Sequence, residues 1–284
     1  RFASFFDIDW APSKKELKGK VLLPVLGDHY GNILTSGKLK FSFEHETGKL
    51  KLHYWDHEFP VNPSSYLIFL EHRINVLEAR LGGNNPDFLE YLSIITQFRK
   101  IPGINESSPE KIAERNREKD IASGRLAALC RRNAAIEGFI QENLNDFQCK
   151  INDPLSCNRI HNLLEEQAYR LAYWRVSIDL INYRRFFDVN YFVGLKTENP
   201  LVFNCTHTLI LDLIEQRKID GLRIDHPDGL LNPTGYFIKL QAEAAKRLGV
   251  NFDPSQEELL GSQQLPVYIV AEKILAPFEK LPRN

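Results

Sequence analysis

Two short stretches near the C-terminal end of the sequence each place a carboxylate at the end of a predicted β-strand. In residues 220–225, Leu222 and Ile224 alternate with Arg223 and Asp225, and this period of two predicts a two-faced strand. The apolar run in residues 267–272 predicts a second strand that ends on Glu272. Neighbouring strands lie about 4.8 Å apart, and retaining glycoside chemistry needs two carboxyl groups about 5 to 5.5 Å apart. The pattern therefore predicts a nucleophile beside a general acid/base.

The two carboxylates have different neighbours in the sequence. Arg223 lies two residues before Asp225, hence on the same strand face, and a guanidinium there stabilises the anion that a nucleophile must be. Glu272 follows a run of apolar and aromatic residues, and a dry setting suits a proton donor. We therefore assign Asp225 as the nucleophile and Glu272 as the general acid/base.

Other interpretations of the same residues stay open at this point. An Asp at a strand end is often a helix N-cap or a turn former, and the sequence His-Pro-Asp-Gly that follows is typical of turns. Arg223 and Asp225 could form a simple buried ion pair. A metal site made of Asp225, His226 and Asp228 is disfavoured, because these residues splay across the turn.

The elements around the two strands predict an α/β fold. A helix at residues 235–248 separates the strands, and strand, helix and strand in that order form a right-handed parallel unit. Further amphipathic helices are predicted at residues 160–182 and 206–217. In parallel barrels the active site lies at the C-terminal strand ends, which is where both carboxylates fall.

The first half of the sequence predicts strands followed by helices. Alternation predicts strands at residues 21–26, 38–43 and 49–55, which would form a small antiparallel unit over residues 20–60. Residues 64–148 predict a helical subdomain, in which residues 108–124 are charged throughout and form a solvated helix or a mobile segment. Its other expected helices span residues 67–81, 87–99 and 125–147.

Composition narrows the class of protein. A net charge of -1 disfavours nucleic acid and anionic membranes as partners, and no apolar run is long enough to span a bilayer.

The four cysteines have no C-x-x-C spacing, so we expect reduced thiols in a cytoplasmic protein; a Cys149–Cys157 bridge is the alternative. His53 and His57 would pair on a metal only within a helix, and their stretch predicts strand and loop. We expect no metal and no cofactor. The sequence contains no Met, and we expect a fragment of a longer protein.

Two motifs resemble conserved regions of the α-amylase superfamily, glycoside hydrolase family 13. GLRIDHPDGL is similar to its second region, with Arg223 and Asp225 matching the arginine and the nucleophile, and VYIVAEKIL is similar to its third, with Glu272 matching the acid/base. Together with FASFFDIDW, LLPVLG, EEQAYRLAYWR and INYRRFFDVN, they resemble the maltooligosyltrehalose synthases within that superfamily. The likeness covers most of the chain and is weakest between about residues 84 and 125.

The resemblance implies a fold and a reaction. The fold would be part of a (β/α)8 TIM barrel with a long inserted β-hairpin and α-helical subdomain. Residues 1–63 would be the insertion with the antiparallel unit, residues 64–180 the helical insertion, and residues 181–284 about the third to fifth barrel strands. The reaction would be an intramolecular transglycosylation, a glucosylmutase step of trehalose biosynthesis that converts the reducing-end α-1,4 bond of a maltooligosaccharide to an α,α-1,1 bond. The family also implies functional coupling to a trehalose-releasing hydrolase.

The same resemblance suggests residues that contact the sugar. Tyr183 and Phe187 would stack on it, and Arg184 and Arg185 would bind its hydroxyls; the alternatives are surface or structural pairing for the arginines and core packing for Phe186 or Phe187. His226 and Lys273 neighbour the two carboxylates and would touch sugar hydroxyls, whereas Asp228 would shape the turn.

One departure from the superfamily pattern limits what this chain is expected to do alone. The early D-x-x-x-N-H region and the late aspartate that stabilises the transition state are not found in the expected order. We expect both to lie outside the chain, which would then be inactive alone. The alternative functions are a plain α-glucan hydrolase with the same carboxylates and a non-catalytic maltooligosaccharide-binding relative.

Overall fold

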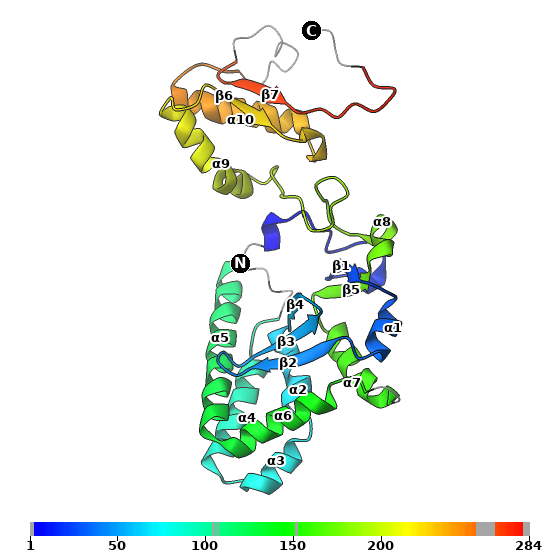
Figure 1. Cartoon of the computed structure of the whole chain (residues 1–284). Helices are drawn as coiled ribbons and strands as arrows, with labels where there is room; N and C mark the ends of the chain where they lie inside the picture. The colour runs from blue at the N-terminus through cyan, green and yellow to red at the C-terminus, as the bar shows by residue number, and fades with distance from the viewer. Residues whose placement is uncertain (1–2, 104–105, 107, 151–152, 254–264, 281–284) are drawn as a thin grey trace. The chain divides into compact units, whose positions relative to one another are not determined.

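A computed structural model describes residues 3–103, 106, 108–150, 153–253 and 265–280 (Figure 1). The chain folds as two compact units. The larger unit is Trp10–Asn182, and the smaller unit combines Arg1–Asp9 with Tyr183–Asn284. Both mix helices and strands, which agrees with the α/β class predicted from the sequence, and each has a hydrophobic core of its own.

A three-stranded antiparallel sheet of β2 (Lys40–Glu44), β3 (Lys49–Tyr54) and β4 (His57–Pro60) packs on the helices of the larger unit. β2 and β3 form the predicted hairpin, with Phe41 opposite Leu52. Alternate residues of both strands are buried, so one face of the sheet lies on the core. The Phe41 ring lies 5.4 Å from that of Phe69 and 5.8 Å from that of Phe147.

Four of the described helices of the larger unit begin at side-chain caps. At each of these, the side chain of the residue before the helix accepts a hydrogen bond from a backbone N–H group of the first turn. The caps are Asn85 for α4 (Pro86–Arg99), Ser108 for α5 (Pro109–Arg132), Asn133 for α6 (Ala134–Asp146) and Asp153 for α7 (Pro154–Glu165). α4 confirms the helix predicted at residues 87–99. The charged segment predicted over residues 108–124 continues past residue 125 as one helix, α5. The next helix, α6, begins later than the predicted residue 125, because Asn133 caps its start.

Two other predictions in the larger unit are wrong. The helix expected over residues 67–81 is divided into α2 (Tyr66–Leu70) and α3 (Ile74–Leu81), with Arg73 in the left-handed region between them at φ 57°. The helix expected over residues 160–182 stops at Glu165; β5 (Tyr169–Tyr173) follows, then the short helix α8 (Ser177–Leu180).

β1 (Val21–Leu26) pairs in parallel with β5 and does not join the antiparallel sheet, contrary to the unit predicted over residues 20–60. Leu23 lies opposite Leu171, and the short helix α1 (Tyr30–Thr35) follows β1. The alternating burial of Tyr169 and Leu171 identifies a strand whose apolar spacing also fits a helix.

The expectation of free thiols throughout the chain is wrong. Cys149 and Cys157 are joined in a disulfide, with their Cα atoms 4.3 Å apart, because the hydrogen bond from the Lys150 N–H to the Ser156 hydroxyl holds the segment after α6 against the start of α7. Cys130 is buried and free, and Cys205 is exposed and free.

The smaller unit is built around a strand–helix–strand crossover. β6 (Gly221–Ile224) and β7 (Tyr268–Ala271) are paired in parallel, with Ile224 opposite Ala271. α9 (Pro200–Glu215) precedes β6, and α10 (Pro233–Leu248) connects the strands and ends at the left-handed Gly249. This crossover confirms the predicted parallel unit. The core joins one strand face to both helices through Phe203, Leu211, Ile214, Leu240, Ala244 and Val267.

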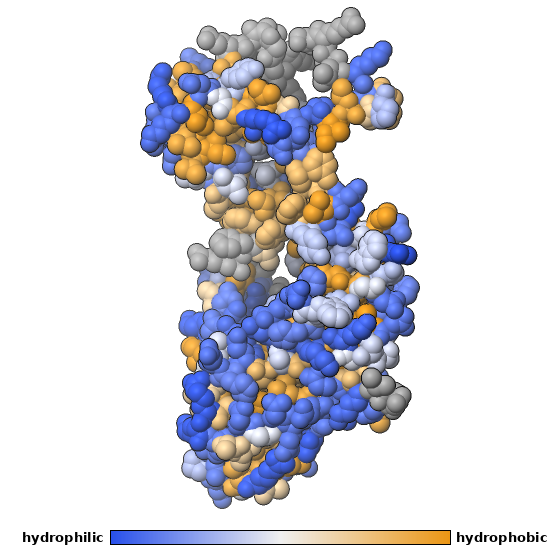
Figure 2. Space-filling view, viewed as in Figure 1, coloured by the Kyte–Doolittle hydropathy of each residue, from blue (hydrophilic) through white to orange (hydrophobic). Residues whose placement is uncertain are grey.

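The other face of the β6–β7 pair carries side chains that are exposed among the described residues. Apolar side chains are exposed over the smaller unit (Figure 2). Among them are Tyr268 and Val270 of β7, which share a strand face with Arg223 through the register. Among the described residues, none of the helices has the length and apolar character needed to cross a membrane.

Candidate active site

The β6–β7 pair brings the two predicted catalytic carboxylates to the same strand end. Asp225 directly follows β6 and Glu272 directly follows β7, each one residue beyond the strand. The pairing continues past the last strand residues, since the Glu272 N–H donates to the Ile224 carbonyl at 2.8 Å. The backbone therefore fixes the relative position of Asp225 and Glu272.

One guanidinium binds both carboxylates. Arg223 Nη1 lies 3.2 Å from Asp225 Oδ1, and its Nη2 lies 3.5 Å from Glu272 Oε1. The sequence predicts the first contact and not the second. The side chain of Arg223 is 64% exposed, that of Asp225 53% and that of Glu272 32%. The dry setting expected for Glu272 is not present in the described part of the chain, because β7 exposes its residues on this face.

His226 joins the two strand ends through its backbone. Its N–H follows Asp225 in the chain and donates to Glu272 Oε2 at 3.3 Å. The residue has φ 45° and ψ 53°, a left-handed conformation that turns the chain directly after the strand. The imidazole ring stacks on Phe187 with centroids 3.8 Å apart, and Phe186 meets it edge-on at 5.1 Å.

Arg184 is held by groups of the protein. Its Nη2 pairs with Asp7 at 2.8 Å, and its Nη1 donates to the Gly229 carbonyl at 3.4 Å. These contacts link the N-terminal segment to the turn after β6. These contacts fit the alternative of structural pairing, and the binding of this guanidinium to sugar hydroxyls stays a prediction.

Tyr183 and Arg185 also form contacts inside their own loop. The Tyr183 hydroxyl donates to the Asn190 carbonyl at 2.8 Å, and burial raises the pKa of Tyr183 above its ordinary value. Arg185 pairs with Asp188 at 2.9 Å and donates to the Asn190 side chain. These residues shape the loop over residues 183–194, and their binding to sugar stays a prediction.

Lys273 follows Glu272 and is held by two acids. Its ammonium lies 2.7 Å from Asp228 and 3.3 Å from Glu279. The hydrogen bonds from Lys273 to Asp228 and then to Glu279 raise the pKa of Lys273 above its ordinary value. Asp228 thus ties the short 3-10 turn after His226 to the segment after β7.

A metal centre is not evident in the residues that the structure describes: no group of three His, Cys, Asp or Glu side chains is arranged to hold an ion. His53 instead contacts the Ser42 hydroxyl through Nε2 at 2.7 Å, across the β2–β3 hairpin.

Sequence reasoning missed the support around His226. A Cβ atom built on Gly229 would lie 2.8 Å from Cδ2 and 3.0 Å from Nε2 of the His226 ring, so Gly229 leaves the room that this ring occupies. Phe186 also supports the His226 ring through an edge-on contact. The glycine of His-Pro-Asp-Gly is a signal for a close approach as well as for a turn, and only the turn was predicted.

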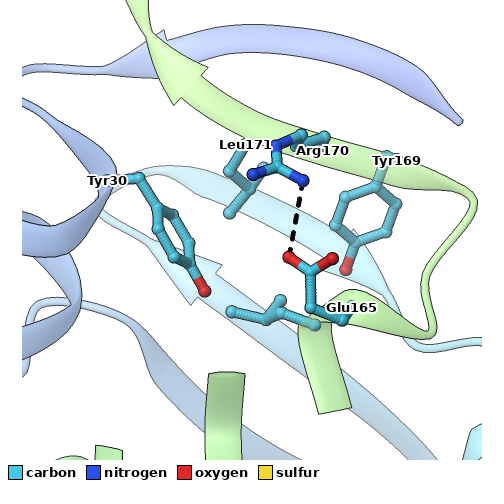
Figure 3. A pocket seen from close by; sticks show the side chains of 6 residues that line it. Tyr30, Glu165, Tyr169, Arg170 and Leu171 are labelled. Atoms are coloured by element: carbon cyan, nitrogen blue, oxygen red, sulfur yellow. Dashed lines mark ion pairs between the residues drawn. The ribbon is translucent and has the colours of Figure 1, made fainter. Parts of the chain in front are cut away.

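The larger unit contains a separate small polar pocket. Figure 3 shows the hydroxyl of Tyr169 beside the carboxylate of Glu165, with Arg170 above it; the Tyr30 hydroxyl lies across the pocket and contacts His161 Nδ1 at 3.0 Å. Glu165 pairs with Lys20 at 3.2 Å and with Arg170 at 3.6 Å. Burial acts to raise the pKa of Glu165, but the hydrogen bond from Lys20 and the two positive charges outweigh it and lower that pKa.

The pocket holds little beyond these side chains. Its volume is about 10 Å³, which is room for about one water molecule. The hydroxyl of Tyr169 is buried and has no hydrogen-bond partner among the described residues. A single carboxylate compensated by two cations is not an acid/base pair, so this pocket is not the catalytic site.

The chain resembles maltooligosyltrehalose synthases in comparisons with known proteins. Two curated proteins of Mycobacterium tuberculosis, from strains CDC 1551/Oshkosh and H37Rv, are provisionally named maltooligosyl trehalose synthase. Each is 37% identical over 117 residues, or 41% of this chain. The chain spans 12% of the length of these relatives. No family model matches the sequence.

Two solved structures also align with this chain. A maltooligosyltrehalose synthase from Arthrobacter ramosus is 22% identical with a TM-score of 0.47, and it covers 99% of this chain, which spans 21% of that structure. The DSM5389 glycosyltrehalose synthase is 23% identical with a TM-score of 0.49, and it covers all of this chain, which spans 23% of that structure. The resemblance predicted from the motifs is confirmed, and it rests on the sequence match with the curated proteins.

Proposed function

We propose that this chain supplies the nucleophile and the general acid/base of a glucosylmutase that forms maltooligosyltrehalose. The observation that carries the proposal is the pair of carboxylates at one end of the β6–β7 pair, held by one guanidinium and one backbone amide. The match with the curated relatives supports the choice of reaction.

In the first step Asp225 attacks the anomeric carbon at the reducing-end α-1,4 bond. The bond from that carbon to the bridging oxygen breaks, and Glu272 gives its proton to this oxygen, which leaves on the terminal glucose. A covalent glycosyl-aspartate with inverted configuration remains. Arg223 touches both carboxylates and stabilises Asp225 as an anion before the attack.

In the second step the released glucose becomes the nucleophile. Glu272, now a carboxylate, takes the proton of the 1-hydroxyl, and that oxygen attacks the anomeric carbon while Asp225 departs. Two inversions retain the α configuration and give an α,α-1,1 bond. No water is consumed, so the product is an isomer of the substrate without a reducing end.

The same proposal includes a (β/α)8 barrel in the complete enzyme. The β6–β7 pair supports the barrel, because its helices cover only one of its two faces in the described part of the chain. The other face exposes Tyr268 and Val270, and a parallel sheet with that face buried would need further strands. A transition-state aspartate would come from the remainder of such a barrel. A hydrolase that releases trehalose would consume the product, since its chemistry requires an α,α-1,1-linked end.

The test uses the protein that carries this chain, maltohexaose as substrate, and NMR of the reducing-end anomeric protons. The proposal expects loss of reducing ends without release of glucose or shorter maltosaccharides, and no reaction by the Glu272→Gln variant. Glu215→Gln on α9, whose carboxylate pairs with Arg247, is the matched control and should retain activity. A rise in reducing ends would identify an α-glucan hydrolase instead, and binding without turnover would identify a non-catalytic relative.

A further inference from the structure

The contact between Glu272 and the His226 amide requires a particular backbone conformation. His226 is one of the non-glycine residues with positive φ, a conformation that needs support from its surroundings. Its N–H donates to Glu272 only while this turn is kept. The groups that fix the imidazole ring of His226 therefore also fix its backbone N–H, which is the donor to Glu272.

The ring of His226 is enclosed by aromatic and backbone groups. Phe187 covers one face at 3.8 Å with an interplanar angle of 29°, and Phe186 meets the ring at 84°. Gly229 lies against the ring edge so closely that a Cβ atom there would overlap Cδ2. The face of Phe187 that contacts His226 is therefore occupied and not free to stack on a sugar.

The loop that carries Phe187 has anchors of its own. The Phe186 N–H donates to the Phe192 carbonyl at 2.8 Å, and the Gly194 N–H donates to the Arg184 carbonyl at 2.7 Å. Arg184 in turn donates to the Gly229 carbonyl beside the His226 ring. Phe187 itself has φ 50°, so two left-handed residues face each other across the stack.

We propose that Phe187 is a positioning residue for the general acid/base. Its ring fixes the imidazole of His226, and through it the backbone amide that donates to Glu272. This inference rests on the proposed function and replaces the sugar-stacking role predicted for Phe187. A residue acting in this way affects the chemical step and leaves substrate binding unchanged.

The test measures kcat and KM for maltohexaose in the protein that carries this chain. Phe187→Ala is expected to lower kcat by roughly 10- to 100-fold, as for a misplaced catalytic group, with KM near the wild-type value. Phe187→Tyr keeps the stacked ring and should restore kcat. Phe192→Ala is the control, because Phe192 is exposed in the same loop and its described ring contact is with Phe186 and not with His226.

Gly229→Ala provides a second variant that does not alter Phe187. Its new methyl group would displace the His226 ring at its Cδ2–Nε2 edge, so the same loss of kcat is expected. NMR gives a readout that does not need activity: the imidazole protons of His226 should be shifted upfield by the Phe187 ring, and should return to ordinary positions in Phe187→Ala and stay shifted in Phe187→Tyr.

The outcomes separate this inference from the proposed function. A raised KM with unchanged kcat in Phe187→Ala would show that Phe187 binds the sugar and would overturn the inference, as would unchanged kinetics. A wild-type protein without mutase activity would overturn the proposed function, while the His226 shifts would still decide whether the stack exists.

Discussion

Arg223 offers a direct test of how the two carboxylates are held. Its guanidinium lies 3.2 Å from Asp225 and 3.5 Å from Glu272, and replacing it by glutamine removes the charge from both contacts. Two unit charges about 4 Å apart interact by about 1 kcal/mol in water and about 4 kcal/mol at an effective dielectric constant of 20. Arg223 is 64% exposed, so in the chain described here the value near 1 kcal/mol applies, before side-chain entropy reduces it further.

A bound maltooligosaccharide changes this balance, because it displaces water from the site. The difference between the two dielectric settings is about 3 kcal/mol, which corresponds to roughly a 100-fold change in rate. We therefore expect Arg223→Gln to lower kcat/KM about 100-fold while changing the free energy of unfolding by less than about 1 kcal/mol.

The assay compares Arg223→Gln with Arg247→Gln. Arg247 also bridges two carboxylates, Asp212 at 2.8 Å and Glu215 at 2.6 Å, but on the outer helices of the same unit. Turnover of maltohexaose and thermal unfolding are measured for both variants. Equal activities in the two variants would refute the reasoning, and so would an activity loss in Arg223→Gln that follows entirely from unfolding.

Three further predictions concern parts of the fold. Burial lowers the pKa of His207 below 6.5, so the stability that it contributes is present above pH 6.5 and is lost as the pH falls through the folded pKa; the protection factors of the α9 amides, which correct each exchange rate for its intrinsic fall with pH, should decrease on acidification and do so less in His207→Gln. Tyr169→Phe should leave the free energy of unfolding of the larger unit unchanged or raise it by up to about 1 kcal/mol, because it removes a buried hydroxyl that has no hydrogen-bond partner among the described residues; a loss of more than about 1 kcal/mol would contradict this. Gly48→Ala should be several-fold more destabilising than Gly19→Ala in urea titrations followed by tryptophan fluorescence. Both glycines have positive φ, but of the two only Gly48 would bring a Cβ atom against a backbone oxygen, that of Ser123 at 1.9 Å. Similar unfolding midpoints for the two variants would contradict this.

The sequence predicted the two strand ends that carry Asp225 and Glu272 because short-range rules determine them. Alternation around Arg223 and Asp225 sets the face of β6, and the crossover through α10 makes the pair with β7 parallel. Parallel pairing then places Asp225 and Glu272 at the same end without any knowledge of the rest of the fold. The resemblance of the two motifs pointed to the same residues.

The errors arose where long-range contacts decide the structure. Residues 169–173 fit a helical spacing and become β5 because β1, nearly 150 residues earlier, is available as a parallel partner. The stack of Phe187 on His226 joins residues that are 39 positions apart, so no local pattern predicts it. The second contact of Arg223, to Glu272, depends likewise on strand pairing and not on spacing.

The proposed mechanism requires Asp225 to form the covalent intermediate while Glu272 acts as the acid/base. The most direct measurement is mass spectrometry of the Glu272→Gln protein after incubation with α-maltosyl fluoride, whose leaving group needs no proton. Without a base at position 272 the second step is blocked, so the account predicts a maltosyl adduct on the peptide containing Asp225 and none in the double variant with Asp225→Asn. An adduct on a different carboxylate, or release of fluoride without any adduct, would contradict it.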